Sequence, residues 1–405
     1  MQIQDDTVYA RAHQFVTASA LGACAAMMVL AGPAWTRNQA NALTITPSFD
    51  SSITAAPDAG EVESTINTVI NSYERLLADP IDVTIFFERA PLLNDRASQS
   101  KASLYAVGYF VYTGQMIVDA VFNNNPVLAT AVTNLASGNQ SGQIVATSAG
   151  LRALGFDAPG LLGTDGERFD GTLDGVITLD SGTDFQFSRP VSPDSLDARW
   201  AIAHEIDEVL GVGGAGGSIL DAAFDSGQAS PPFFGGVIGG EDLYRYAAPG
   251  VPSLTLNPAA TAFFSIDGGK TDLARFNQDP TMDYADWYAK DPCLPLVQRA
   301  AFCNGLAVDV TRDSPEVVAL QAVGYELLSV PEPTTAAILI VGLSGVAALS
   351  TIARRCRKAE QPYVPRRRNA TTIRNVTCEK HPCSAALGVR RRVAAPRDAE
   401  QVTMA

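Results

Sequence analysis

The stretch that decides the fold is WAIAHEIDEVLG, residues 200–211. It predicts the second half of a helix spanning residues 193–210. Ser192 suits the cap position, Pro193 suits the first turn, and Gly211 suits the residue that ends the helix. Residues four apart lie on one side of a helix, so His204 and Glu208 are expected side by side.

This helix carries a variant of the HExxHxxG pattern of zinc peptidases. His204, Glu205 and Gly211 match it, and Glu208 stands where the second histidine is usual. Glu205 is then predicted to be the general base that accepts a proton from water. Glutamate is an established zinc ligand, so Glu208 is compatible with a metal site.

The histidine count restricts the metal site further. The chain has three histidines, His13, His204 and His381, and the first and last fall in the predicted targeting segments. A site in the globular part therefore has one imidazole, with carboxylates or carbonyls completing it. Zinc is the predicted ion, and manganese, iron and calcium stay open alternatives.

The third ligand is not fixed by spacing. The metzincin pattern would place a histidine at 214, where this chain has Gly214. Four downstream acids are candidates: Asp221, Asp225, Glu241 and Asp242. Glu241 and Asp242 are favoured because they follow a glycine-rich stretch long enough to fold back. Tyr244 or Tyr246 is the expected donor to a developing oxyanion.

The elements around the helix predict an α+β domain over residues 43–328. Helices are predicted over residues 61–78, 98–122 and 148–154, and strands over 81–87, 141–147 and 175–180. Alternation of the two predicts a mixed sheet backed by helices, and the chain after Leu210 is loop-rich.

The amino end predicts a targeting segment. Residues 1–42 contain an apolar stretch followed by Ala40-Asn41-Ala42, a small-x-small site. This predicts a secretory signal that signal peptidase cleaves before Leu43. An uncleaved membrane anchor is the alternative.

The carboxy end predicts a sorting segment over residues 329–358. Pro331-Glu332-Pro333 precedes an uncharged segment, 334–353, long enough to cross a membrane, and residues 354–358 are strongly basic. This order resembles the PEP-CTERM sorting signal, which implies handling by an exosortase-type enzyme at the cell surface. A plain membrane anchor is the alternative. Residues 359–405 form a basic, low-structure tail, which is either a cytoplasmic extension or an error in the reading frame.

The charge and the cysteines of the chain restrict its possible binding partners and its cellular compartment. Residues 43–330 hold 14 basic and 36 acidic residues, so nucleic acid is excluded as a partner of this part. A divalent-cation-binding protein and a solvated acidic surface both fit that charge. Cys293 and Cys303 are predicted to form a disulfide in an oxidising compartment. The Cys378–Cys383 pair in the tail is not assigned as a metal site.

Several motifs together resemble one family, the metalloproteases that carry PEP-CTERM sorting signals. The matching segments are 204–211, 242–250 (DLYRYAAPG), 263–269 (FFSIDGG), 283–287 (DYADW) and 322–325 (AVGY). The resemblance implies a zincin-like fold, in which an edge strand before the helix holds the substrate. Residues 175–180 are the expected edge strand.

The function expected from these features is an exported, surface-destined, zinc-dependent endopeptidase acting on protein or peptide substrates. His204, Glu208 and Glu241 or Asp242 are its predicted metal ligands, and Glu205 and Tyr244 its predicted catalytic residues. The alternative is a non-catalytic surface or matrix protein built on a degenerate peptidase scaffold.

Overall fold

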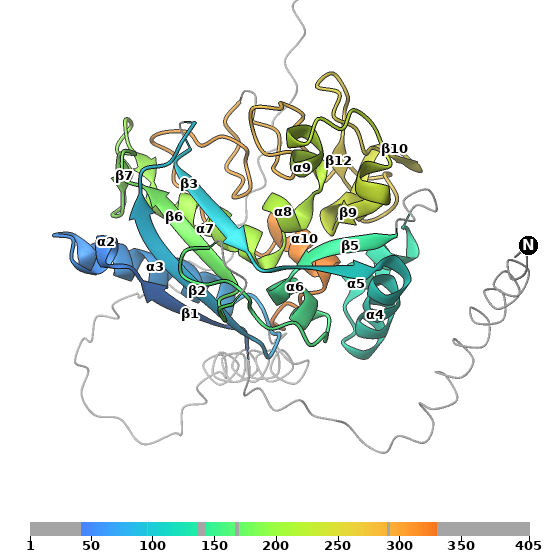
Figure 1. Ribbon diagram of the computed structural model, residues 1–405, viewed down its shortest axis with the longest axis horizontal. Coiled ribbons are helices and arrows are strands. Elements are labelled where there is room, and N and C mark those ends of the chain that lie inside the picture. Colours follow the sequence, from blue (N-terminus) through green and yellow to red (C-terminus); the bar gives the residue numbers. More distant parts are fainter. Residues whose placement is uncertain (1–41, 95, 136–141, 167–169, 290–291, 330–405) are drawn as a thin grey trace, which may run out of the picture. The chain divides into compact units, whose positions relative to one another are not determined.

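Four strands of the amino-terminal half form the main sheet, in the order β1-β2-β6-β3 (Figure 1). They are β1 (Thr44–Phe49), β2 (Asp82–Ala90), β6 (Gly175–Asp180) and β3 (Ser98–Ala102). The first three are mutually parallel, and β3 runs antiparallel to β6 at the edge. The computed structural model describes residues 42–94, 96–135, 142–166, 170–289 and 292–329.

Two helices cover one face of this sheet. Along β2, Val83, Ile85 and Phe87 are fully buried, while the residues between them are only partly buried. The buried face packs against α3 (Ala59–Glu74) and α7 (Ala198–Leu210), which also contact each other. The period-two pattern of the strand thus supplies one wall of the core, and the helices supply the other.

Helix α7 approaches the sheet closely because β6 begins with glycine. A Cβ atom on Gly175 would lie 2.4 Å from a methyl group of Val209. Any side chain there would push α7 away from β6. This contact fixes the distance between the sheet and the helix that carries the HEIDE sequence.

Residues 98–122 depart from the predicted helix. Only Tyr109–Phe122 is helical (α4), and ten of the eleven residues before it form β3 and a further strand, β4 (Leu104–Gly108). The prediction was wrong there because non-local pairing decides the structure: β3 pairs with β6, and β4 pairs with β5 (Gln143–Thr147). The expected edge strand is wrong for the same reason, since β6 is internal and β3 is the edge.

Three smaller sheets complete the described part. One has the order β4-β5-β9, one β11-β10-β12-β13, and one pairs β7 with β8. The new strands are β7 (Phe185–Gln186), β8 (Leu196–Asp197), β9 (Val237–Gly239), β10 (Arg245–Ala248), β11 (Val251–Pro252), β12 (Phe263–Phe264) and β13 (Ala274–Arg275).

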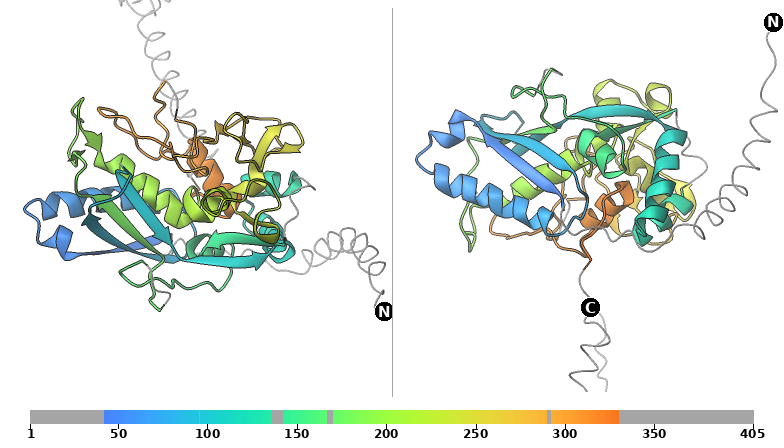
Figure 2. Two further views of the ribbon diagram at one scale, coloured as in Figure 1. Left: turned by 45° about the horizontal axis from the view of Figure 1, so that its top comes forward. Right: turned by 90° about the horizontal axis from the view of Figure 1, so that it is seen from below.

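The remaining helices are short and lie mainly in the second half of the domain (Figure 2). They are α2 (Ser51–Thr54), α5 (Pro126–Thr133), α6 (Ser148–Ala153), α8 (Gly214–Gly217), α9 (Leu220–Asp225), η2 (Phe233–Gly235), η3 (Glu241–Tyr244) and α10 (Pro315–Val323). The predicted α+β class is confirmed.

The predicted signal, the sorting segment with residues 334–353, and the tail lie outside the described residues. Within the part that the structure describes, no helix is both long and apolar enough to cross a membrane.

Candidate metal centre

Helix α7 begins later than the sequence predicts. Its first residue is Ala198, and Asp197 caps it by accepting a hydrogen bond from the Arg199 amide. The expected cap, Ser192, lies before β8 instead, since the chain must first pair β8 with β7. The predicted end is confirmed: Gly211 adopts φ 110° and its amide bonds back to the last turn.

The side chains of His204 and Glu208 point to a common position, where Asp286 joins them. His204 Nε2 lies 3.5 Å from Glu208 Oε1 and 3.6 Å from Asp286 Oδ2. Among the described residues, these three form the one group of His, Cys, Asp and Glu that brackets a possible ion position. All three side chains are buried.

These distances fit a small divalent ion. Two ligand atoms that each lie about 2.0–2.1 Å from a tetrahedral zinc ion are roughly 3.3–3.4 Å apart. The measured separations of 3.5 and 3.6 Å need only a small closure to reach this geometry. Both donor types, imidazole nitrogen and carboxylate oxygen, are ones that zinc binds in proteins.

The imidazole of His204 is oriented by a backbone carbonyl. His204 Nδ1 lies 3.1 Å from Val297 O, so this nitrogen carries the proton that it donates. The lone pair of a neutral ring is then on Nε2, which faces the two carboxylates. The side-chain amide of Gln298 donates to Asp286 Oδ1 at 2.9 Å and lies 3.4 Å from His204 Nε2.

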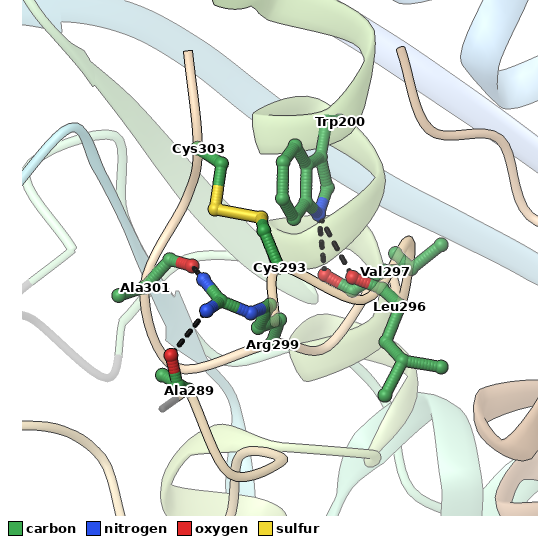
Figure 3. The surroundings of a disulfide bond; sticks show 8 residues. All are labelled: Trp200, Ala289, Cys293, Leu296, Val297, Arg299, Ala301 and Cys303. Carbon is green, nitrogen blue, oxygen red and sulfur yellow. Dashed lines mark hydrogen bonds between the residues drawn. A yellow bond between two sulfur atoms is a disulfide. The ribbon is translucent and has the colours of Figure 1, made fainter. Parts of the chain in front are cut away.

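The segment that holds Val297 and Gln298 is a loop closed by a disulfide (Figure 3). Cys293 and Cys303 are bonded, with their Cα atoms 6.6 Å apart, which confirms the predicted disulfide. Trp200 on α7 donates its indole N–H to the carbonyl oxygens of Leu296 and Val297, each at 3.0 Å. The loop is therefore fastened to the helix one turn before His204.

Phe302 from the same loop covers the imidazole. Its ring packs edge-on against both Trp200 and His204, with centroids 5.2 Å apart in each case. An apolar ring at this position lowers the local dielectric and limits how far water reaches the histidine.

Glu208 is held from its other side by the edge strand. Ser100 on β3 donates its hydroxyl to Glu208 Oε2 at 2.5 Å. Burial opposes ionisation of Glu208, but hydrogen bonds and charge from His204 and Ser100 outweigh it and lower the pKa of this carboxyl. In the metal-free protein, a protonated His204 thus keeps Glu208 in its carboxylate form.

Glu205 has a different environment. It is 3% exposed, and its Oε2 has no hydrogen-bond partner among the described residues. Burial and the neighbouring charge of Glu208 raise its pKa well above the usual value. A buried carboxyl next to the first candidate ligand, with an oxygen free of hydrogen bonds, is placed as a general base would be.

Negative groups outnumber positive ones around the imidazole. Burial also raises the pKa of Asp286 well above its usual value, and the Asp283 carboxyl raises it further while His204 opposes the shift. Burial therefore favours the protonated, neutral form of Asp286 in the metal-free protein, and a divalent cation bound there would stabilise its carboxylate form.

The favoured third ligands, Glu241 and Asp242, lie elsewhere. Glu241 accepts a hydrogen bond from the Gly213 amide at 2.7 Å. Asp242 accepts from the Ser218 hydroxyl and from the amides of Ile219 and Gly239. Both acids are fully buried, and they brace the turns after α7 without joining the His204 group.

The other predicted residues are also occupied elsewhere. The Tyr244 hydroxyl donates to Ala322 O at 2.6 Å, and the Tyr246 hydroxyl donates to Asn134 O at 3.1 Å. Asp225 is exposed. Asp221 accepts from the Tyr284 amide at 3.1 Å, so this candidate ligand anchors the segment that delivers Asp286.

Asp286 is the site residue that the sequence prediction missed. It lies within DYADW, residues 283–287, which was noted only as part of the family resemblance. Two carboxylates just before a buried tryptophan in a loop-rich region were the available signal. Trp287 donates its indole N–H to Glu316 Oε1 on α10 at 3.0 Å, which fixes the segment in the core.

Comparison with models of known families, with curated proteins and with solved structures finds no match for this chain.

Proposed function

We propose that this domain is a metal-dependent peptidase whose ion, zinc by preference, is held by His204, Glu208 and Asp286. The observation that carries the proposal is the convergence of three donor atoms within 4.8 Å of one another, with His204 Nε2 3.5 and 3.6 Å from the two carboxylates. Two donors come from adjacent turns of α7 and the third from a loop 78 residues later in the chain.

The chain's own residues would divide the chemistry of hydrolysis. A zinc ion at this site would supply Lewis acidity toward water and the substrate carbonyl. Glu205 would accept the proton of the attacking water and pass it to the leaving amine. Its buried, unpartnered oxygen supports this role.

The edge of the main sheet supports a peptide as the substrate. Strand β3 is the last strand of the sheet, runs antiparallel to β6, and contacts α7. An extended peptide added to such an edge gains backbone hydrogen bonds without sequence-specific contacts. Because Ser100 of β3 also binds Glu208, a peptide on this edge would lie beside the metal ligands. We include a zincin-like fold in the proposal on these grounds.

The proposed setting of the enzyme is the cell surface. The basis is the sequence of both ends, a cleavable signal over residues 1–42 and a PEP-CTERM-type sorting segment over 329–358, with 334–353 in the membrane. Signal peptidase and an exosortase-type enzyme are the proposed partners. The Cys293–Cys303 disulfide agrees with an oxidising compartment.

A second candidate is a non-catalytic surface protein on the same scaffold. His204 is only 6% exposed, and burial opposes its protonation, but the charges of Asp286, Glu205 and Glu208 raise its pKa overall. A protonated His204 between two carboxylates would be a structural ion triad that needs no metal. This candidate predicts a metal-free protein.

The test is elemental analysis of the purified chain followed by a casein-cleavage assay, with Glu205→Gln compared against Glu61→Gln on the exposed side of α3. We expect about one zinc per chain in all three forms, and hydrolysis in every form except Glu205→Gln. Metal-free protein without hydrolysis would favour the structural triad. Bound metal with equal cleavage by Glu205→Gln would remove Glu205 from the mechanism.

A further inference from the structure

One side of helix α4 presents an apolar surface to solvent. We call it the α4 outer face, and it consists of Val111, Gly114, Ile117, Val118, Val121 and Phe122. The spacing of three and four residues places all six on one side of the helix. The large side chains among them are between 44% (Val118) and 80% (Phe122) exposed.

The opposite side of α4 already packs in the core. Tyr112, Met116 and Ala120 are buried there, against α5 and strands β4 and β5. The single charged residue of α4, Asp119, is also buried. A helix that is apolar all round is normally covered on every side, so the outer face is a candidate contact surface.

We infer that the α4 outer face binds the same face of a second copy of this chain, in a two-fold symmetric pair. The five large side chains leave roughly 500 Å² of surface accessible per copy, so a pair would bury at most about 1,000 Å², which corresponds to a weak dimer at the lower limit for a specific contact. In a two-fold contact, each residue of the face lies near the same residues of the partner copy. Because the six residues of the face are uncharged, no like charges are brought together.

Gly114 allows the two helices to approach closely. It lies within the outer face, and a Cβ atom built on it meets nothing within 4 Å. The α4 backbone is therefore accessible at this point, which suits a short distance between paired helices. A hollow of about 350 Å³ adjoins the face; Val118, Phe122 and Ile81 line one part of it, and the charged residues Asp79, Arg152 and Glu326 another.

A second copy suits the face better than a lipid surface does. Helices that lie on membranes usually carry Lys or Arg along their polar edge, and α4 has neither. The 36 acidic against 14 basic residues of positions 43–330 would also be repelled by anionic lipids. The same charge opposes pairing of two copies at low salt, so added salt should strengthen the pair.

The experiment is sedimentation equilibrium of the full chain in a mild detergent, comparing the wild type with Gly114→Arg and Val118→Lys. Leu93→Arg, at an 81% exposed site away from α4, is the matched control. We expect the wild type and the control to form dimers that tighten with salt, and both α4 variants to dimerise at least about 100-fold more weakly. Arginine has a higher helix propensity than glycine, so Gly114→Arg should unfold at no lower temperature than the wild type.

Two results would overturn the inference. One is a wild type that stays monomeric at about 100 µM, or variants that dimerise like the wild type. The other is binding to phosphatidylcholine vesicles that Gly114→Arg weakens while both forms remain monomeric, which would assign the face to a lipid surface.

Discussion

The Nδ1 atom of His204 lies 3.1 Å from the carbonyl oxygen of Val297, and this hydrogen bond determines which ring nitrogen faces the carboxylates. The loop from Cys293 to Cys303 is thereby part of the candidate metal centre, although it supplies none of the three donors. Fixing a histidine tautomer through a backbone carbonyl is a common means of tuning a metal site.

Asp286→Asn should lower metal affinity by more than about 100-fold, because a neutral amide replaces one of two anionic ligands. Asp225→Asn, at an exposed position on α9, should leave affinity unchanged. Zinc titration against a competing chelator measures both. Equal affinity in the two variants would mean that Asp286 does not bind the ion.

Gln298→Leu should weaken metal binding by about 10–100-fold while the ligands stay in place. The amide of Gln298 holds Asp286 Oδ1 at 2.9 Å, and leucine fills a similar volume without a donor. The off-rate of zinc, measured by transfer to a chromogenic chelator, should rise. Unchanged release would show that Asp286 is positioned without this amide.

Replacing both cysteines, Cys293→Ser with Cys303→Ser, should destabilise the loop and the metal centre together. Closing a ten-residue loop contributes about 2–3 kcal/mol through the unfolded state. We expect a lower unfolding temperature and faster zinc release, because the Val297 carbonyl and Phe302 are then less firmly held. Faster unfolding with unaltered zinc release would separate the loop from the site.

Asp79→Asn should stabilise the domain in alkaline but not in acidic solution. Burial raises the pKa of Asp79 to about 8. The native state therefore keeps this carboxyl protonated, while the unfolded chain ionises it from about pH 4. Stability is lost as pH rises between these values, by at most about 1.4 kcal/mol per pH unit.

Asparagine removes this titration and keeps an acceptor for the Glu326 amide, which bonds Asp79 at 3.0 Å. Thermal unfolding at pH 4, 6 and 8 should give a difference between variant and wild type that grows with pH. A difference that is constant across this range would contradict the assignment.

Local signals in the sequence predicted the helix of the site but not its start. Gly211 ends α7 as expected, since a left-handed cap position favours glycine. The start was misplaced because Ser192-Pro193 is also a good initiation signal, and only the pairing of β8 with β7 delays the helix to Ala198. A single sequence does not reveal which signal tertiary contacts will select.

The proposed third ligand could not be predicted from the local sequence for a related reason. Glu241 and Asp242 were favoured by their distance along the chain from α7. Both instead accept hydrogen bonds from backbone amides. Asp286 reaches the site because Asp221 and Glu316 fix the segment around Trp287. Those contacts join residues 29 and 63 positions apart. Such long-range contacts cannot be predicted from the spacing of residues in the sequence.

The division of the donors between α7 and a distant loop also affects how the protein matures. His204 and Glu208 are adjacent as soon as the helix forms, but Asp286 arrives only when the chain from Asp221 to Glu316 has docked. Under the proposed function, ion capture and completion of the fold are one thermodynamic event. A chelator is then expected to loosen this half of the domain first, so that proteases cut it before the main sheet.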